Sequence, residues 1–290
     1  MLNFTEIIVK FLETLAMEEQ KAPLTLVAYS NDLKQVFAEK QEMTVLELKL
    51  TVTKFLRSIS HLSPATRGRK IATLKKFYQY LKQNNIVDEA HPHLVTPKNP
   101  QKLPNFLTVD EAIAVLKSFE TLPLDPEAKQ RAQRQHVLFL LLYGAGLRVS
   151  EACNLTWQAV NLSRREMRVL GKGNKERAIS FPVLLLKKLA SVRETQQQKY
   201  IWGDKPLNTR TAYNDITACG LNAGLSHHIH PHALRHSFAT HLLNDGADLR
   251  VIQEMLGHSN LGATERYTHV TLNQLSQTLE KLHPLSKKTV

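Results

Sequence analysis

The sequence predicts a mainly α protein of two domains: an N-terminal domain of four helices and a larger, mixed but mostly helical domain with a small β-hairpin. Apolar residues recur at helical spacing over most of the chain. Prolines crowd one segment near residue 100, and two short extended runs flank a turn that contains glycine. The length of 290 residues is also long for one domain and ordinary for two.

The first domain, residues 1–89, is expected to hold the four helices. The fourth should open at Ser63 and Pro64, because serine caps helix N-termini and proline suits the first turn. The third has the weakest apolar pattern. The helices are expected over residues 4–15, 24–37, 44–59 and 63–81.

A linker is predicted over residues 90–106, because proline disrupts the hydrogen bonding of helices and sheets. Its prolines are Pro92, Pro97, Pro100 and Pro104. The second domain then covers 107–290 and opens with a helix that Thr108 can cap. Within it, Met167–Leu170 and Arg177–Phe181 are predicted as two strands of a hairpin, with Lys172 at the tip.

Composition points to a polyanionic partner. Lys and Arg number 38 against 26 Asp and Glu, which gives a net charge of +12 and favours nucleic acid or an anionic membrane surface. No apolar run approaches the ~20 residues of a membrane span, and the N-terminus lacks a signal-peptide layout. The cysteines Cys153 and Cys219 form no metal-binding or redox pair. A reduced, cytoplasmic location without a membrane partner is therefore predicted.

A run of one charge sign lies in the first domain. No acidic residue occurs between Glu47 and Asp88, whereas nine basic residues do. Such a run is either a solvated face or a surface that faces phosphates, and the interleaved aromatic residues favour phosphates. The basic residues are Lys49, Lys54, Arg57, Arg67, Arg69, Lys70, Lys75, Lys76 and Lys82.

Three polar segments in the second domain stand out. In LLYGAGLRVSEACNL, Arg148 lies at a junction between two helices, and Ser150 is expected to cap the second. In HPHALRHSFATHLL, His232 and Arg235 are three residues apart and share a helix face. The third segment, LGHSNLGATERYTHV, contains a histidine and a tyrosine nine residues apart. Taken singly, each has an ordinary structural explanation, such as an arginine that closes a helix end.

Together these residues fit the cleavage of a phosphodiester without metal or water. Tyr267 can attack the phosphorus, and the two forked arginines can hold the non-bridging oxygens. Lys172 can protonate the leaving 5′ oxygen, and His232 can accept or shuttle the tyrosine proton. His258 can donate a further hydrogen bond to the phosphate.

The strings GAGLRVSE, GKGNKER, HPHALRHSFATHLL and LGHSNLGATERYTHV resemble the catalytic boxes of the tyrosine recombinase (phage integrase) family, most of all its bacterial Xer subgroup. The resemblance spans about 105–275. TLVAYSNDL and TRGRKIATLKKFYQYL resemble more loosely the family's four-helix core-binding (SAM-like) domain. The resemblance assigns the catalytic roles to Arg148, Lys172, His232, Arg235, His258 and Tyr267, with Tyr267 as the nucleophile.

The resemblance also implies the reaction and its partners. Two protomers would bind double-stranded DNA with paired inverted half-sites, and two sites would join in a homo- or hetero-tetramer. Strands would exchange through a 3′-phosphotyrosyl link and a Holliday junction, without cofactor or metal. Chromosome-dimer resolution is the implied role, with a paralogous recombinase and a DNA translocase as further partners. The alternative is the integrase of a mobile element or integron. DNA contacts are expected from Arg67, Arg69, Lys70, Lys75 and Arg177.

Three rival interpretations stay open. Histidines crowd residues 227–236, but zinc needs three or four convergent ligands, and neither a nearby cysteine nor the glutamate of zinc proteases is present; no metal is predicted. A DNA-binding protein without activity would be expected to lack some of the six residues. A type IB topoisomerase shares the tyrosine chemistry and would relax any supercoiled plasmid.

The C-terminal segment is predicted as a short helix with one leucine stripe, which Pro284 ends. The stripe either packs in the core of its own domain or, as the resemblance implies, docks on a neighbouring protomer. The latter is expected. Its members are Leu272, Leu275, Leu279 and Leu282.

Overall fold

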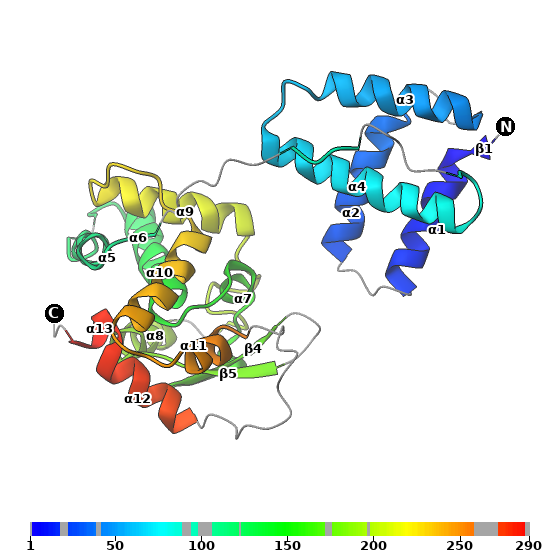
Figure 1. Ribbon diagram of the computed structural model, residues 1–290. Helices are drawn as coiled ribbons and strands as arrows, with labels where there is room; N and C mark the ends of the chain where they lie inside the picture. Colours follow the sequence, from blue (N-terminus) through cyan, green and yellow to red (C-terminus); the bar gives the residue numbers. More distant parts are fainter. Residues whose placement is uncertain are drawn as a thin grey trace. The chain divides into compact units, whose positions relative to one another are not determined.

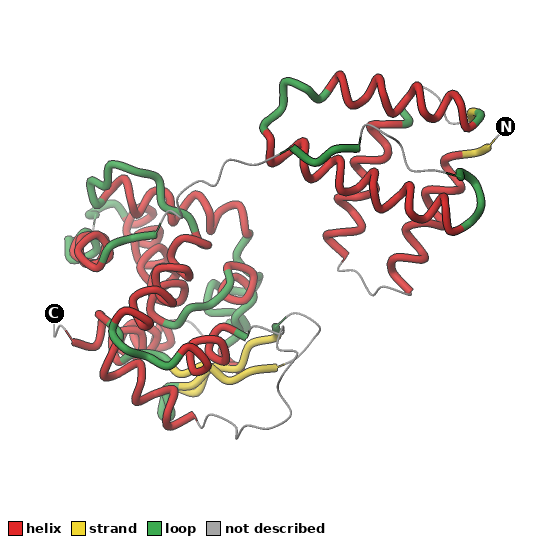
Figure 2. Tube along the Cα trace, viewed as in Figure 1, coloured by secondary structure: helices red, strands yellow, loops and turns green. Residues whose placement is uncertain are grey.

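The computed structural model describes residues 2–17, 23–38, 42–88, 94–97, 106–121, 123–171, 176–195, 198–257 and 272–287. The chain divides into two compact units, Met1–Lys102 and Leu103–Val290, which we describe separately. Helices dominate each unit (Figures 1 and 2), so the prediction of a mainly α fold is confirmed.

The first unit is helical, as predicted. Thr44 and Ser63 cap its third and fourth helices, and Pro64 occupies the first turn of the fourth. A short antiparallel pair of two-residue strands joins residues 2–3 to 42–43, which the sequence pattern did not indicate. Within its described residues the unit contains β1 (Leu2–Asn3), α1 (Phe4–Met17), α2 (Pro23–Val36), β2 (Glu42–Met43), α3 (Val45–Ser58) and α4 (Pro64–Gln83).

Aromatic rings fill the core of the first unit. Phe4 stacks on Phe37 with ring centroids 5.0 Å apart, and Phe11 meets Phe77 edge-on at 5.2 Å. All four rings are buried, and edge-on and stacked pairs of this kind add to the free energy gained by burial. The apolar stripes of α1 and α4, together with Phe37 just after α2, thus meet in one core.

The second unit adds a small sheet to its helices. Thr108 caps its first helix with a capping box, as predicted. Its described elements are α5 (Val109–Lys117), α6 (Pro126–Phe139), α7 (Val149–Cys153), β3 (Val160–Asn161), β4 (Glu166–Leu170), β5 (Glu176–Ser180), α8 (Val183–Thr195), α9 (Thr209–Asn222), α10 (Pro231–Asn244), α11 (Leu249–Leu256), α12 (Leu272–Leu282) and α13 (Pro284–Lys287).

The sheet has the antiparallel order β3-β4-β5, and its β4–β5 pair is the predicted hairpin. Val169 lies opposite Arg177, and Met167 lies opposite Ile179. Met167, Val169 and Ile179 are buried, whereas Arg168 between them is exposed. The alternation that a half-buried strand requires is therefore present, and one face of the hairpin points into the unit.

The centre of the second unit is a fully buried segment between α6 and α7. Helix α6 passes into one π-helical turn, Leu140–Gly144, and every residue of that turn is buried. Helices α8 and α10 pack against it. A helix that is apolar on all sides must be covered on all sides, and this covering fixes where the chain emerges toward Arg148.

The C-terminal helices pack on their own unit. Figure 1 shows α12 beside β5, and the side chains of Leu279 and Leu285 are buried in the second core. The expectation that the leucine stripe leaves its own domain is therefore wrong for Leu279. The side chains of Leu272 and Leu275 lie outside the described residues. Helices long and apolar enough to cross a membrane are absent from the described part of the chain.

Candidate active site

Arg148 is presented by a tight turn between the buried core segment and α7. Gly146 has a φ of +66°, and a Cβ atom there would lie 2.6 Å from the Phe238 ring of α10. Only glycine allows this close approach. Arg148 itself is the N-cap residue of α7, and its backbone N–H donates to Glu151 Oε2 at 2.7 Å. The predicted capping role of Ser150 is wrong, because Ser150 lies inside the helix.

Arg235 and His232 are carried by α10. Pro231 occupies the first turn of this helix, and His230 caps it by accepting the N–H of Ala233 at Nδ1, at 3.1 Å. His232 is exposed, with its ring 6.2 Å from that of Tyr213. Arg235, one turn later, donates to the carbonyl oxygens of Gly146 and Leu256. Sequence spacing therefore placed both residues on the correct helix.

Glu151 is the centre of the arginine cluster, and sequence reasoning missed it. Its side chain is only 3% exposed. Arg148 Nη1 lies 2.9 Å from Oε1, and Arg177 forms a two-pronged ion pair at 2.7 and 2.8 Å. Arg235 Nη1 lies 3.9 Å from Oε2. The available signal was the acidic residue three positions after Arg148, which is also where a capping carboxylate is placed.

Electrostatics shift the pKa values of Glu151 and Arg235. Burial alone would raise the pKa of Glu151, but hydrogen bonds and charge from Arg177 and Arg148 bring it below the usual value. Burial and the neighbouring Arg148 lower the pKa of Arg235 to about 10, which still leaves it protonated. Three guanidinium groups thus share one carboxylate, and the uncompensated positive charge suits an anion.

The same three arginines bond to the C-terminal end of α11. Arg177 Nε donates to Met255 O at 3.3 Å, Arg235 to Leu256 O, and Arg148 Nη2 to Gly257 O at 3.1 Å. The final carbonyls of a helix lack partners within it and carry partial negative charge, so cations are stabilising there. Arginines from three separate elements therefore fix the point at which the chain leads on to His258.

The structure describes three of the six predicted catalytic residues, Arg148, His232 and Arg235. Lys172, His258 and Tyr267 lie outside the described residues. The structure brings Arg148 and Arg235 together and places His232 one helical turn before Arg235. The assignments at the other three positions remain predictions.

The basic run of the first unit does not form one uniform surface. Lys70 is buried, and its Nζ donates to Asp32 Oδ1 at 3.1 Å and to Gln35 Oε1 at 2.6 Å. Arg69 is half-exposed and also pairs with Asp32. Lys70 is therefore a structural cation that joins α4 to α2. The prediction that it contacts DNA is wrong.

The other predicted DNA contacts differ in exposure. Lys75 is exposed, with Nζ 2.9 Å from Thr96 Oγ1, and Arg67 is partly exposed. Arg177 is directed inward, with a side chain 13% exposed. Arg177 donates its hydrogen bonds to Glu151 and to the carbonyl of Met255. The prediction that it contacts DNA is therefore also wrong.

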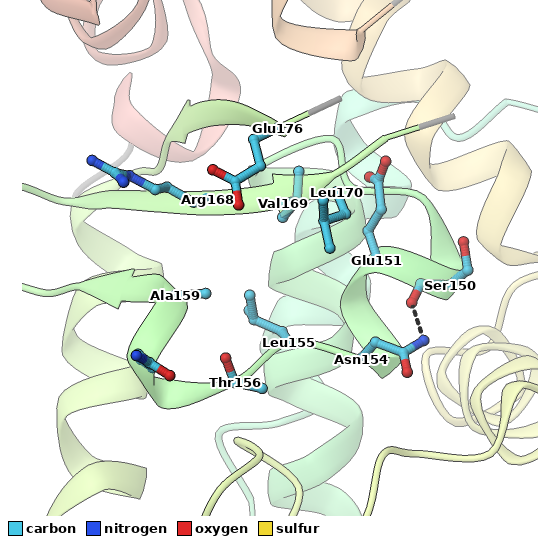
Figure 3. Close-up of a pocket in the computed structure, with 11 residues that line it drawn as sticks. Ser150, Glu151, Asn154, Leu155, Thr156, Ala159, Arg168, Val169, Leu170 and Glu176 are labelled. Atoms are coloured by element: carbon cyan, nitrogen blue, oxygen red, sulfur yellow. Dashed lines mark hydrogen bonds between the residues drawn. The ribbon is translucent and has the colours of Figure 1, made fainter. Parts of the chain in front are cut away.

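Figure 3 shows a hollow of the second unit, with a volume of about 740 Å³, that Glu151 helps to line. It is bounded by one side of α7, the segment 154–159 and the strands β4 and β5. Of the cluster it shares only Glu151, and the hydrogen bond from Asn154 to Ser150 O closes part of its wall. The three arginines of the cluster do not line this hollow.

Comparison with known families gives two matches. Residues 105–274 match the phage integrase family, and residues 8–85 match the phage integrase N-terminal SAM-like domain. Curated relatives include the tyrosine recombinase XerC of Myxococcus xanthus, which is 34% identical and aligns over 98% of this chain and 99% of its own. XerC of Staphylococcus carnosus is 36% identical, over 96% and 97%.

Solved structures show the same fold. A lambda integrase tetramer bound to a Holliday junction aligns with a TM-score of 0.68 at 17% identity, over 92% of this chain and 80% of that one. The XerH recombinase in a pre-cleavage complex with its difH substrate gives 0.62 at 24% identity, over 89% and 79%.

Proposed function

Because the chain belongs to the phage integrase family and is a site-specific DNA recombinase, we propose that Tyr267 is its nucleophile. The hydroxyl oxygen attacks the scissile phosphorus, a bond forms from Tyr267 to the 3′ phosphate, and the bond to the 5′ oxygen breaks. His232 takes the tyrosine proton, and Lys172 supplies a proton to the 5′ oxygen. The freed 5′ hydroxyl of a partner strand later reverses these steps and displaces the tyrosine.

The observation that carries this proposal is the joint anchoring of Arg148 and Arg235. They come from different elements, approach the same Glu151, and bond to successive carbonyls at the end of α11. Two forked donors preorganised in this way suit the two non-bridging oxygens of a phosphate whose charge grows in the transition state. His258 follows Gly257 directly in the sequence, and we assign it the further hydrogen bond to the phosphate.

The biological role we propose is resolution of chromosome dimers in the cytoplasm. The chain would act on paired inverted half-sites as a homo- or hetero-tetramer, with a paralogous recombinase and a DNA translocase as partners. The names of the XerC relatives support the Xer-type role. The lambda integrase tetramer on a Holliday junction supports the proposed assembly.

Trapping the covalent intermediate tests the nucleophile. A binding site is first selected from random-sequence DNA, and a nicked duplex that carries it lets the cleaved strand diffuse away. Wild-type protein should form a covalent adduct, and Tyr267→Phe should form none while still binding the site. Tyr200→Phe removes a hydroxyl elsewhere in the same unit and should behave as wild type. A normal adduct yield from Tyr267→Phe contradicts the assignment.

Substitution of the leaving oxygen tests Lys172. A 5′-bridging phosphorothioate needs no acid, so it should restore cleavage by Lys172→Ala. Equal defects on the sulfur and oxygen substrates would assign the acid role to another group. Joining of two selected sites, without relaxation of plasmids that lack them, separates recombinase from topoisomerase action.

A further inference from the structure

Arg177 lies on the inward face of the hairpin. Its strand partner across β4 is Val169, which is 5% exposed, and residues directly opposite in a ladder share a face. Ile179, two residues later on β5, is fully buried. The backbone register thus directs the Arg177 side chain toward α7 and α11 and away from solvent.

Arg177 donates a hydrogen bond to each carboxylate oxygen of Glu151. Nη1 lies 2.7 Å from Oε1 and Nη2 lies 2.8 Å from Oε2, which is the fork-to-fork geometry of a strong pair. These oxygens also lie within reach of the arginines assigned to the phosphate, at 2.9 Å for Arg148 and 3.9 Å for Arg235. A carboxylate in this place competes with a phosphate for the same donors.

Arg177 also contacts the end of α11. Its Nε donates to Met255 O at 3.3 Å, and its Cδ would lie 2.8 Å from a Cβ atom on Gly257. Gly257 ends α11 with a φ of +64° and accepts a hydrogen bond from Arg148 through its carbonyl. One side chain therefore touches the carboxylate, the helix end and the turn that holds Arg148.

We propose that Arg177 is a positioning residue of the recombinase: it binds Glu151 so that Arg148 and Arg235 stay available to the scissile phosphate. This inference rests on the proposed roles of those two arginines. Without Arg177, the two oxygens of Glu151 lose a pair of close donors, and the carboxylate draws both guanidinium groups toward itself. The same loss removes one of three positive charges from a site that must stabilise a growing negative charge.

A double substitution separates this role from a general structural one. Arg177→Gln should slow single-turnover adduct formation on the nicked selected duplex by about 10²-fold, as small misplacements of reacting groups do. Adding Glu151→Gln removes the competing charge and should recover at least about 10-fold of that loss. Arg168→Gln, an equal charge change at an exposed position of the same sheet, should leave the rate unchanged.

DNA binding supplies the second readout. Arg177→Gln should leave the affinity and its salt dependence unaltered, whereas loss of a phosphate contact would lower the log–log slope by about 0.9. A lowered slope overturns the proposal and makes Arg177 a DNA contact. A double variant no faster than Arg177→Gln also overturns it.

A folding control and the wild-type protein complete the design. If circular dichroism shows that Arg177→Gln does not fold, Arg177→Lys keeps the charge without the fork, and the comparison runs on Arg177→Lys with and without Glu151→Gln. Absence of any adduct from wild-type protein would contradict the proposed function, whereas a wild-type adduct without recovery in the double variant contradicts only the role of Arg177.

Discussion

The Nε2 atom of His283 lies 3.0 Å from the backbone carbonyl of Tyr143, which ties the C-terminal helices to the turn that leads to Arg148. Leu285 N donates to His283 Nδ1 at 3.1 Å, so Nδ1 is the unprotonated nitrogen and Nε2–H donates to Tyr143. His283 is fully buried and therefore neutral in the folded chain. The C-terminal segment is thus bonded into the core of the second unit.

Shortening the buried Leu285 should destabilise the second unit. Leu285→Ala should lower the free energy of unfolding by about 2–4 kcal/mol, because it leaves a cavity beside Gly144. Leu221→Ala, at a position 59% exposed in α9, should change it by less than about 0.5 kcal/mol. Urea unfolding followed by the fluorescence of Trp157 and Trp202, both in this unit, measures the difference. Equal effects of the two substitutions would show that burial of Leu285 does not stabilise the second unit.

Acid should lower the free energy of unfolding, because the buried His283 is held neutral in the folded chain. Burial lowers the pKa of His283 to about 3, below the ordinary value of 6.5, so the unfolded chain binds the proton more readily. The stabilisation is complete above pH 6.5 and declines as the pH falls toward 3, by up to about 1.4 kcal/mol per pH unit.

His283→Gln isolates this contribution, because glutamine does not titrate. The pH profile of its unfolding free energy between pH 6.5 and 4 should be shallower than that of wild type. Burial also lowers the pKa of His136 and of His241, and both histidines remain in the two proteins under comparison. Parallel profiles would contradict the assignment to His283.

Gly146 and Gly224 form a matched pair for the turn before Arg148. Both have positive φ, at +66° and +71°, so alanine is strained at either position by about 1–2 kcal/mol. Only at Gly146 does the new Cβ meet a ring, that of Phe238 at 2.6 Å. Gly146→Ala should therefore cost about 1–3 kcal/mol more than Gly224→Ala in urea unfolding and should also slow cleavage. Equal losses would contradict the close packing of this turn.

Lys70 and Lys75 should respond in opposite ways to removal of their charge. Lys70→Met leaves Asp32 buried with Arg69 and Thr73 and should cost about 3 kcal/mol in unfolding of the full chain, followed by circular dichroism. Lys75→Met should leave stability unchanged and lower the salt slope of DNA binding by about 0.9. A lowered slope from a folded Lys70→Met protein would reinstate Lys70 as a DNA contact.

Replacing the guanidinium group of either Arg148 or Arg235 by an ammonium group should reduce the rate of cleavage. Arg148→Lys and Arg235→Lys keep the charge but lose the planar fork, and each should slow adduct formation by about 10²–10³-fold. Site binding, measured by gel shift, should change much less. Near-normal single-turnover rates in either variant would contradict the proposal that Arg148 and Arg235 hold the two non-bridging oxygens of the phosphate.

Helix ends were predictable because their signals are local. Ser63 and Thr108 cap their helices, as the proline after Ser63 and the acidic residues after Thr108 predicted. Arg148 and Arg235 were identified through their sequence context, although their meeting at Glu151 depends on the packing of both α7 and α10 against the buried segment Leu140–Gly144. A buried carboxylate looks in sequence like an ordinary capping residue, so Glu151 carried no distinctive local signal.

The errors at Lys70 and Arg177 have a common cause. Both basic residues were predicted as DNA contacts without regard to the face of the helix or strand on which they lie. Lys70 continues the buried stripe of Leu74, Phe77 and Leu81 on α4, and Arg177 shares a face with Ile179 on β5. The periodicity that located the core also marked these two cations as inward-facing.

Helix α11 is an intrinsic reporter of the arginine cluster. An eight-residue helix is marginal alone, and three carbonyls at its C-terminal end, those of Met255, Leu256 and the capping Gly257, accept from Arg177, Arg235 and Arg148. A ligand that recruits Arg148 or Arg235 must compete with those carbonyls, so occupancy and fraying of the helix are thermodynamically linked. The backbone amides of α11 would then exchange with deuterium at a rate that depends on site occupancy, which allows the site to be followed without a label.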